Sequence, residues 1–132
     1  MTVRTHNDHS FAVVITPNFV EAEDIADALR RVGFDNVTHF RSAADARDGL
    51  AEAAVLPECA LLSLHGADVA ADDLCGRLHR AGCRLVLING DPARAKEIDA
   101  AFLLRPYSDT ELDGCIVDVM RGRLSASGAQ QA

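Results

Sequence analysis

Five strand-like runs divide the chain, and each is followed by a segment with helical spacing. The runs cover residues 11–15, 36–40, 59–64, 83–88 and 100–104. Most are continuously apolar, which is typical of strands buried on both faces, whereas 36–40 alternates between β-branched or aromatic and other residues. The pattern predicts five short strands, most of them with both faces covered.

Helix signals follow the first three strand-like runs. Asn18-x-x-Glu21 has the spacing of a capping box, and apolar residues then recur at helical intervals until Gly33. Ser42 is placed to cap an alanine-rich helix that runs to about residue 54. A third helix is expected over 68–82, with acidic residues early and basic residues late, as the helix dipole favours.

The last two helices are expected to differ in length. Residues 93–99 leave room for at most two helical turns before the fifth strand, so we expect a shortened fourth helix. Ser108-x-x-Glu111 is a second capping-box pattern and begins the fifth helix.

Alternating strands and helices predict an α/β fold with a doubly wound, five-stranded parallel sheet. Parallel strands need crossover connections, and right-handed crossovers place helices on both faces of the sheet. We expect the strand order 2-1-3-4-5. The predicted domain covers residues 11–123, between a flexible arm at 1–10 and a disordered tail at 124–132.

Charge and composition exclude several partners. The formal net charge is −7 and the isoelectric point is near 5.0, so attraction to nucleic acids or anionic membranes is not expected. No apolar run approaches the ~20 residues that a bilayer span needs, and residues 1–10 lack a signal-peptide core. A cytoplasmic protein is therefore expected.

Candidate metal ligands are present but poorly grouped. The cysteines form no C-x-x-C pair, and buried reduced thiols are favoured over a disulfide or metal role. The pairs His65 with Asp68, and His6 with His9, have generic spacing and are better explained as solvated side chains. We therefore predict no metal and no cofactor. The cysteines are Cys59, Cys75, Cys83 and Cys115.

In a doubly wound sheet, ligands bind beyond the carboxyl ends of the strands. The segments there are ITPNF at the end of strand one, CALLSLHG at strand three, LVLING at strand four and FLLRPYS at strand five. Together they resemble the receiver domains of bacterial response regulators, over roughly residues 11–121. The most specific match is Arg-Pro-Tyr-Ser, which is similar to the Lys-Pro-Phe/Tyr-Ser signature of that family. The resemblance implies a flavodoxin-like receiver fold and a role in two-component signalling.

The same resemblance marks a degenerate phosphorylation site. Thr16 and Pro17 stand where the family has the paired acids that hold Mg²⁺, and Ser63 stands at the phosphoacceptor aspartate. Asn89 replaces a hydroxyl residue, and Arg105 replaces the lysine that pairs with the phosphoryl group. Without carboxylates, a hard divalent cation is poorly bound, and phosphorylation at this edge is not expected.

Other interpretations of these residues stay open at this point. The favoured explanation of Thr16, Ser63 and Asn89 is local hydrogen bonding to the backbone, with Arg105 reaching into solvent. Arg105 could instead bind a small anion or a partner's carboxylate, because its planar fork favours bidentate partners. A Ser63–His65 hydrolase is less favoured, since no G-x-S-x-G elbow surrounds the serine and no acid is placed to orient the histidine.

A scaffold that keeps its fold but lacks the reactive residues suggests a non-enzymatic bacterial interaction module. We expect a stand-alone adaptor or regulator that contacts a histidine kinase, another regulator or a second copy of itself, independently of phosphorylation. The expected contact face includes Arg94, Lys96, Phe102 and Tyr107, with the fifth helix. The alternative function is a sensor that binds a small anion or nucleotide around Arg105.

Overall fold

The structure, a computed structural model, describes residues 11–53, 55–63 and 69–121. The predicted arm at 1–10 and tail at 124–132 lie outside these residues, as do His6, His9, His65 and Asp68. Expectations about those segments and side chains therefore remain predictions.

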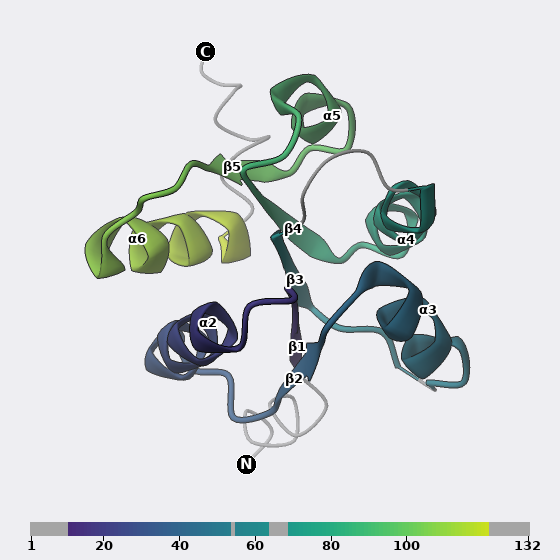
Figure 1. Ribbon diagram of the computed structural model, residues 1–132, viewed down its shortest axis with the longest axis horizontal. Coiled ribbons are helices and arrows are strands. Elements are labelled where there is room, and N and C mark those ends of the chain that lie inside the picture. The colour runs from purple at the N-terminus through teal and green to yellow at the C-terminus, as the bar shows by residue number, and fades with distance from the viewer. Residues whose placement is uncertain (1–10, 54, 64–68, 122–132) are drawn as a thin grey trace.

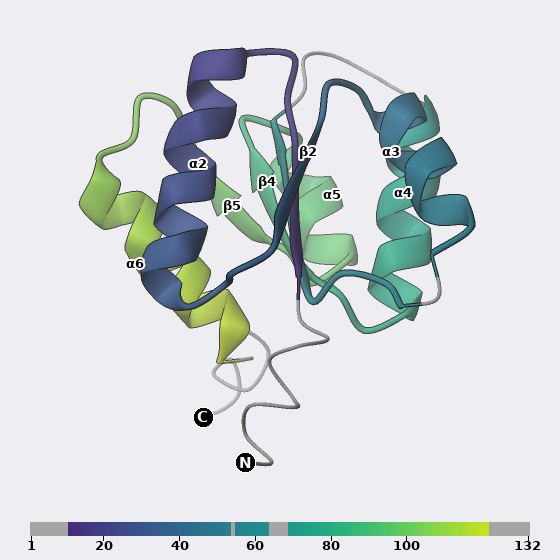
Figure 2. The same cartoon turned by 90° about the horizontal axis from the view of Figure 1, so that it is seen from below.

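The five predicted strands form one parallel sheet in the order β2-β1-β3-β4-β5 (Figures 1 and 2). The register pairs Val13 with both Thr38 and Ala60, and Leu87 with Phe102. This order confirms the doubly wound prediction. The strands are β1 (Ala12–Ile15), β2 (Val37–Phe40), β3 (Cys59–Ser63), β4 (Arg84–Ile88) and β5 (Ala101–Leu103).

Helices cover both faces of the sheet, as the crossover connections require. In Figures 1 and 2, α2 and α6 lie together on one face, and α3, α4 and α5 lie on the other. The short helix predicted between strands four and five is confirmed as α5, which has 6 residues. The helices are α2 (Phe19–Val32), α3 (Ala43–Ala51), α4 (Val69–Arg80), α5 (Pro92–Glu97) and α6 (Asp109–Met120).

The core consists of two apolar layers separated by the sheet, because successive strand side chains point to opposite faces. Val13 and Leu85 pack toward α3 and α4, and Val14 and Leu61 pack toward α2 and α6; all four are at most 1% exposed. The covered layers explain why the central strands are continuously apolar.

Local signals set where helices begin and end. Asn18 accepts a hydrogen bond from the Glu21 backbone N–H at 3.0 Å, and Ser108 with Glu111 forms the predicted capping box. Gly33 has a φ of 124° and donates its N–H to the last carbonyls of α2. That conformation costs glycine little and would strain any residue with a side chain.

Candidate functional site

Three of the predicted strand-end residues surround a buried carboxylate at the carboxyl ends of the strands; they are Thr16, Ser63 and Arg105. The carboxylate belongs to Glu21, which the sequence pattern assigns to a capping box. Glu21, in the first turn of α2, is 9% exposed. Its expected capping-box bond to Asn18 is not formed, because the Asn18 N–H donates to the Thr16 hydroxyl instead, at 3.1 Å. The Glu21 side chain turns inward and becomes the centre of the site.

Five hydrogen bonds from four side chains reach the Glu21 carboxylate. Thr16 and Ser63 donate their hydroxyls to Oε1, at 3.1 and 2.7 Å, and the Tyr107 hydroxyl donates to Oε2 at 2.7 Å. Arg105 donates from Nε to Oε2 and from Nη2 to Oε1, both at 3.0 Å. A buried charge is tolerated when it is paired and fully hydrogen-bonded, as this carboxylate is.

Arg105 is part of this cluster rather than a solvated side chain. Its side chain is 28% exposed, forms the bidentate pair with Glu21, and also donates from Nη2 to the Ser63 hydroxyl. The interpretation that Arg105 extends into solvent without a partner in the chain is therefore wrong, although part of the side chain stays exposed. The Ser63 hydroxyl also has a carboxylate beside it, since a Glu21 oxygen lies 2.7 Å from its Oγ.

The hydrogen bonds control the protonation of Glu21. Burial alone raises the pKa of the carboxyl group, but the bonds from Arg105, Tyr107, Ser63 and Thr16 outweigh burial and lower the pKa from 4.5 to about 2. The same contacts raise the pKa of Arg105, mainly through its bond to Glu21, and burial with donation to Glu21 raises the pKa of Tyr107. At neutral pH the site holds one carboxylate and one guanidinium.

This assignment predicts a specific acid dependence of stability. Because the folded-state pKa of Glu21 lies below its ordinary value, its stabilising contribution is complete above about pH 4.5 and is lost as pH falls toward 2. A shift of that size corresponds to ~3 kcal/mol. Urea titrations at several pH values should show that, between about pH 4.5 and 2, the free energy of unfolding falls by this much more in the wild-type protein than in Glu21→Gln. Parallel pH profiles of the two proteins would contradict the assignment.

The remaining predicted positions lie close to the cluster with different roles. Asn89 directly follows β4 in a left-handed conformation, with a φ of 58°, and its side chain accepts the Arg105 backbone N–H at 2.8 Å. It therefore positions the segment that carries Arg105 and is not among the side chains bonded to Glu21. Pro17 is exposed. His39, which no sequence pattern indicated, lies with its Nε2 2.9 Å from the Thr16 carbonyl oxygen.

The residues predicted as a contact face are partly engaged within the molecule. Arg94 in α5 lies 3.1 Å from Glu97 and donates to the backbone carbonyl of Asp72 in α4. Phe102 packs partly buried against the core, and Tyr107 is bonded to Glu21. Lys96 is exposed.

Metal ligands do not gather in the described part of the chain. Residues 11–53, 55–63 and 69–121 contain no group of three or more His, Cys, Asp or Glu side chains that could hold an ion. Cys59, Cys75 and Cys83 are buried and Cys115 is partly buried, all as free thiols. Burial raises the pKa of Cys75 to about 11 and that of Cys83 to about 12. Within the same residues, no helix is long and apolar enough to cross a bilayer.

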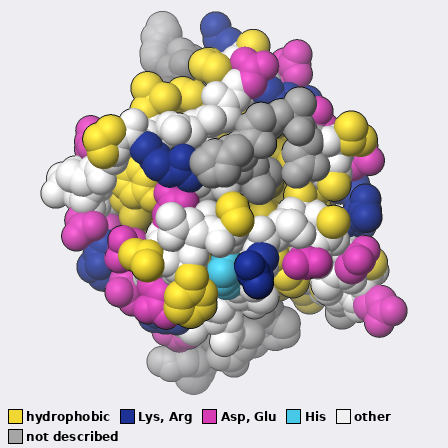
Figure 3. All heavy atoms as spheres, viewed as in Figure 1, with side chains coloured by type: hydrophobic (Ala, Val, Ile, Leu, Met, Phe, Trp, Pro, Cys, Tyr) yellow, Lys and Arg dark blue, Asp and Glu magenta, His cyan; other side chains and the backbone are white. Residues whose placement is uncertain are grey.

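Figure 3 shows the face of the molecule onto which the carboxyl ends of the strands open. Basic, acidic and hydrophobic side chains are interspersed on this face and do not separate into large patches of one kind. Among the described residues on this face, basic side chains therefore form no broad surface of the kind that attracts a phosphate backbone.

Comparison by sequence finds no matching family model and no matching curated protein. Comparison by structure finds receiver domains. The signal receiver domain of an HD domain-containing protein from Pseudomonas fluorescens Pf-5 is 18% identical, with a TM-score of 0.68 over 92% of this chain and 93% of that chain.

Two further structures show the same likeness. The response regulatory domain of mrkE from Klebsiella pneumoniae is 15% identical, with a TM-score of 0.68 over 92% of this chain and 99% of that chain. The REC domain of RcsB from Salmonella enterica serovar Typhimurium, solved in the presence of phosphomimetic BeF3−, is 12% identical, with a TM-score of 0.66 over 86% and 90% of the two chains. The sheet order and these likenesses show that the chain has the flavodoxin-like fold of response-regulator receiver domains.

Proposed function

We propose that this protein is a receiver-like signalling module that acts by protein–protein interaction without phosphorylation, as an adaptor or regulator in a two-component-type pathway. The observation that carries the proposal is the Glu21–Arg105 pair. Arg105 stands where the sequence resembles the phosphate-binding lysine of receiver domains, and its fork is bonded to a carboxylate of the same chain at 3.0 Å.

An incoming phosphoryl group would meet this carboxylate. Glu21 is ionised at neutral pH and bonded to Ser63, so a phosphoryl dianion at Ser63 would lie against a like charge unless Glu21 moved away. Thr16 and Pro17 provide no carboxylate with which a divalent cation could offset that charge. The site thus carries its own anion, and we infer that it is held in one state rather than switched by phosphate.

The same bonds weigh against a sensor of small anions around Arg105. A free anion would have to displace Glu21 from both bonded nitrogens of the fork. The interaction face stays our proposal for the output of the molecule. Lys96 and Phe102 are its candidate contact residues, while Arg94 and Tyr107, held by internal bonds, would shape it.

Titration with Mg²⁺ and beryllofluoride, followed by backbone NMR, tests the proposal. We expect no saturable shifts at Ser63, Asn89 or Phe102 in the wild-type protein, because neither the metal nor the phosphoryl analogue has a site. Incubation with acetyl phosphate and mass spectrometry should likewise detect no phosphorylated protein. A receiver domain with its aspartates intact serves as the positive control for both reagents. Saturable shifts centred on Ser63, or a phosphorylated product, would overturn phosphate independence.

A further inference from the structure

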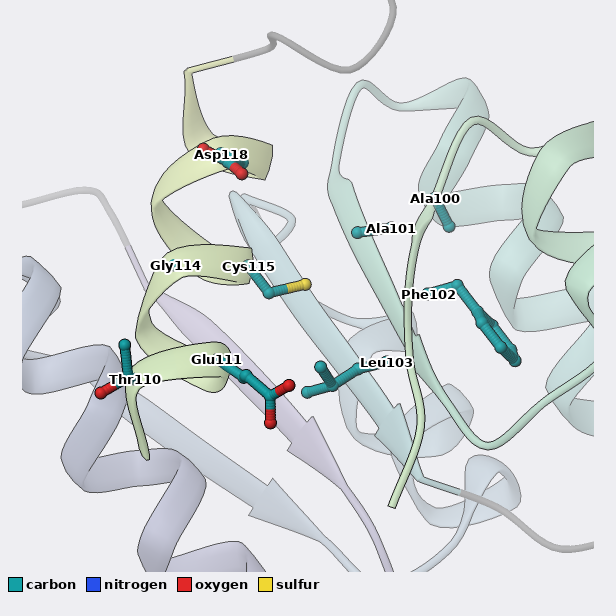
Figure 4. A pocket seen from close by; sticks show the side chains of 9 residues that line it. All are labelled: Ala100, Ala101, Phe102, Leu103, Thr110, Glu111, Gly114, Cys115 and Asp118. Atoms are coloured by element: carbon teal, nitrogen blue, oxygen red, sulfur yellow. The ribbon is translucent and has the colours of Figure 1, made fainter. Parts of the chain in front are cut away.

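A groove of about 550 Å³ lies between β5, the outer strand of the sheet, and α6 (Figure 4). In Figure 4 the side chains of Glu111 and Cys115 point from α6 toward β5, and the Phe102 ring points away to the other side of the strand. The groove is therefore open along one face of the strand. Its lining comprises Ala100, Ala101, Phe102, Leu103, Thr110, Glu111, Gly114, Cys115 and Asp118.

Small residues keep this groove open. A Cβ added at Gly114 would meet no atom within 4 Å, so no neighbouring side chain explains a glycine at this position. Glycine in a helix interior costs about 1 kcal/mol relative to alanine. Gly114 is accordingly the residue whose replacement would fill the groove without disturbing the core.

The outer edge of β5 has no neighbouring strand in the described sheet, where β5 pairs with β4 alone. The Asn89 N–H donates to the Leu103 carbonyl at 2.8 Å, which shows that Leu103 directs its backbone toward β4. Because alternate residues of a parallel strand bond to the same neighbour, the N–H and C=O of Phe102 face the open edge. An added strand could pair with them.

The charges in the groove have one sign. Glu111 and Asp118 are its charged lining residues, and none of the residues that line it is basic. Asp113, which lies nearby on α6, is already paired with Arg31 at 2.7 Å. A segment that enters the groove therefore meets two exposed carboxylates and no basic lining residue. Glu111 also accepts the Ser108 backbone N–H at 2.8 Å through Oε1.

From this combination we propose that the groove docks a basic, extended segment of a partner protein, which adds to β5 as a further strand. Main-chain hydrogen bonds to Phe102 would supply affinity, and alternate side chains of the segment would enter the groove opposite Gly114. Lysine or arginine side chains of the segment would pair with Glu111 and Asp118. The inference rests on the proposed function, since it names the partner chemistry of an interaction module.

The probe is a short peptide of alternating lysine and valine. It is added to the 132-residue chain without Mg²⁺ or any phosphoryl donor. We expect saturable NMR shifts of the Phe102, Leu103 and Cys115 amides, and none with the matched glutamate–valine peptide. Gly114→Leu should weaken binding at least tenfold while thermal stability is kept or raised, because leucine is the better helix former. Asp118→Lys should also weaken binding about tenfold, and Gly114→Ala should fall between wild type and Gly114→Leu.

Three results of the peptide titrations would overturn the inference. They are equal shifts from the lysine and glutamate peptides, shifts outside the groove, and undiminished binding by Gly114→Leu. Shifts of the same amides that grow with protein concentration in the absence of peptide would show that a second copy of the chain occupies the groove, and would overturn it too. Failure here leaves the beryllofluoride result intact, because the two experiments use different reagents and Phe102 is the one amide that both follow.

Discussion

Replacing Glu21 by glutamine is expected to lower the free energy of unfolding by about 3 kcal/mol. The substitution keeps the size of the side chain but removes the charge that Arg105 is bonded to by both Nε and Nη2. Removing one partner of a buried ion pair leaves the other charge uncompensated, which typically costs 3–5 kcal/mol. We expect the low end of that range because the Arg105 side chain is 28% exposed and can still reach water. Urea denaturation at neutral pH measures the change.

The chain offers a matched control at its surface. Arg31 and Asp113 also form a close pair, at 2.7 Å, but their side chains are 46% and 36% exposed. Asp113→Asn should therefore cost less than about 1 kcal/mol. If Glu21→Gln cost no more than Asp113→Asn, the Glu21–Arg105 pair would not hold the site together, and the proposal of a built-in anion would lose its support.

The sequence predicted the architecture because the signals that set it are local. Continuous apolar runs indicate buried strands, and residues such as Gly33 and Ser108 mark helix ends within a few positions of the chain. The short α5 follows from the few residues between β4 and β5. Each of these features could be derived without knowledge of distant contacts.

The centre of the site was missed because it depends on contacts far apart in sequence. Glu21 lies 84 residues from Arg105 and 42 from Ser63, so no local pattern joins them. The Asn18-x-x-Glu21 spacing also has a sufficient local explanation as a capping box. Only one of the two bonds of that motif is present, the one from the Glu21 backbone N–H to the Asn18 side chain. The available signal was Arg105 itself, since a guanidinium fork at a strand end favours a bidentate carboxylate.

Restoring an aspartate at residue 63 is expected to be strongly destabilising as long as Glu21 is present. Ser63 is 0% exposed, and its Oγ lies 2.7 Å from a Glu21 oxygen. Ser63→Asp would place a second carboxylate against that of Glu21, and the two would share a single guanidinium, that of Arg105. Two carboxyl groups so close together cannot both ionise without a large cost in free energy. We expect the single variant to lose more than about 3 kcal/mol of stability.

The double variant Ser63→Asp/Glu21→Gln separates the effect of the aspartate's charge on stability from the effect of its size. With Glu21→Gln in place, the aspartate has Arg105 to itself, and Ser63→Asp should cost about 2 kcal/mol less than it does in the wild-type background. Ser63→Asn, which matches the size of aspartate without its charge, should cost nearly the same in both backgrounds. Urea titrations of the single and double variants give the interaction energy directly.

A positive coupling would mean that this edge of the sheet has room for one anion, whichever element supplies it. In this chain the anion comes from α2, whereas in the receiver domains that the sequence resembles it would come from the phosphorylated end of β3. In that case the two solutions would exclude each other, because both would need the cation at position 105 as the counter-charge, and the paired acids of the family pattern could be absent while the fold is kept. Additive effects of Ser63→Asp and Glu21→Gln would show instead that the two positions do not compete, and that the internal carboxylate does not take the place of phosphate.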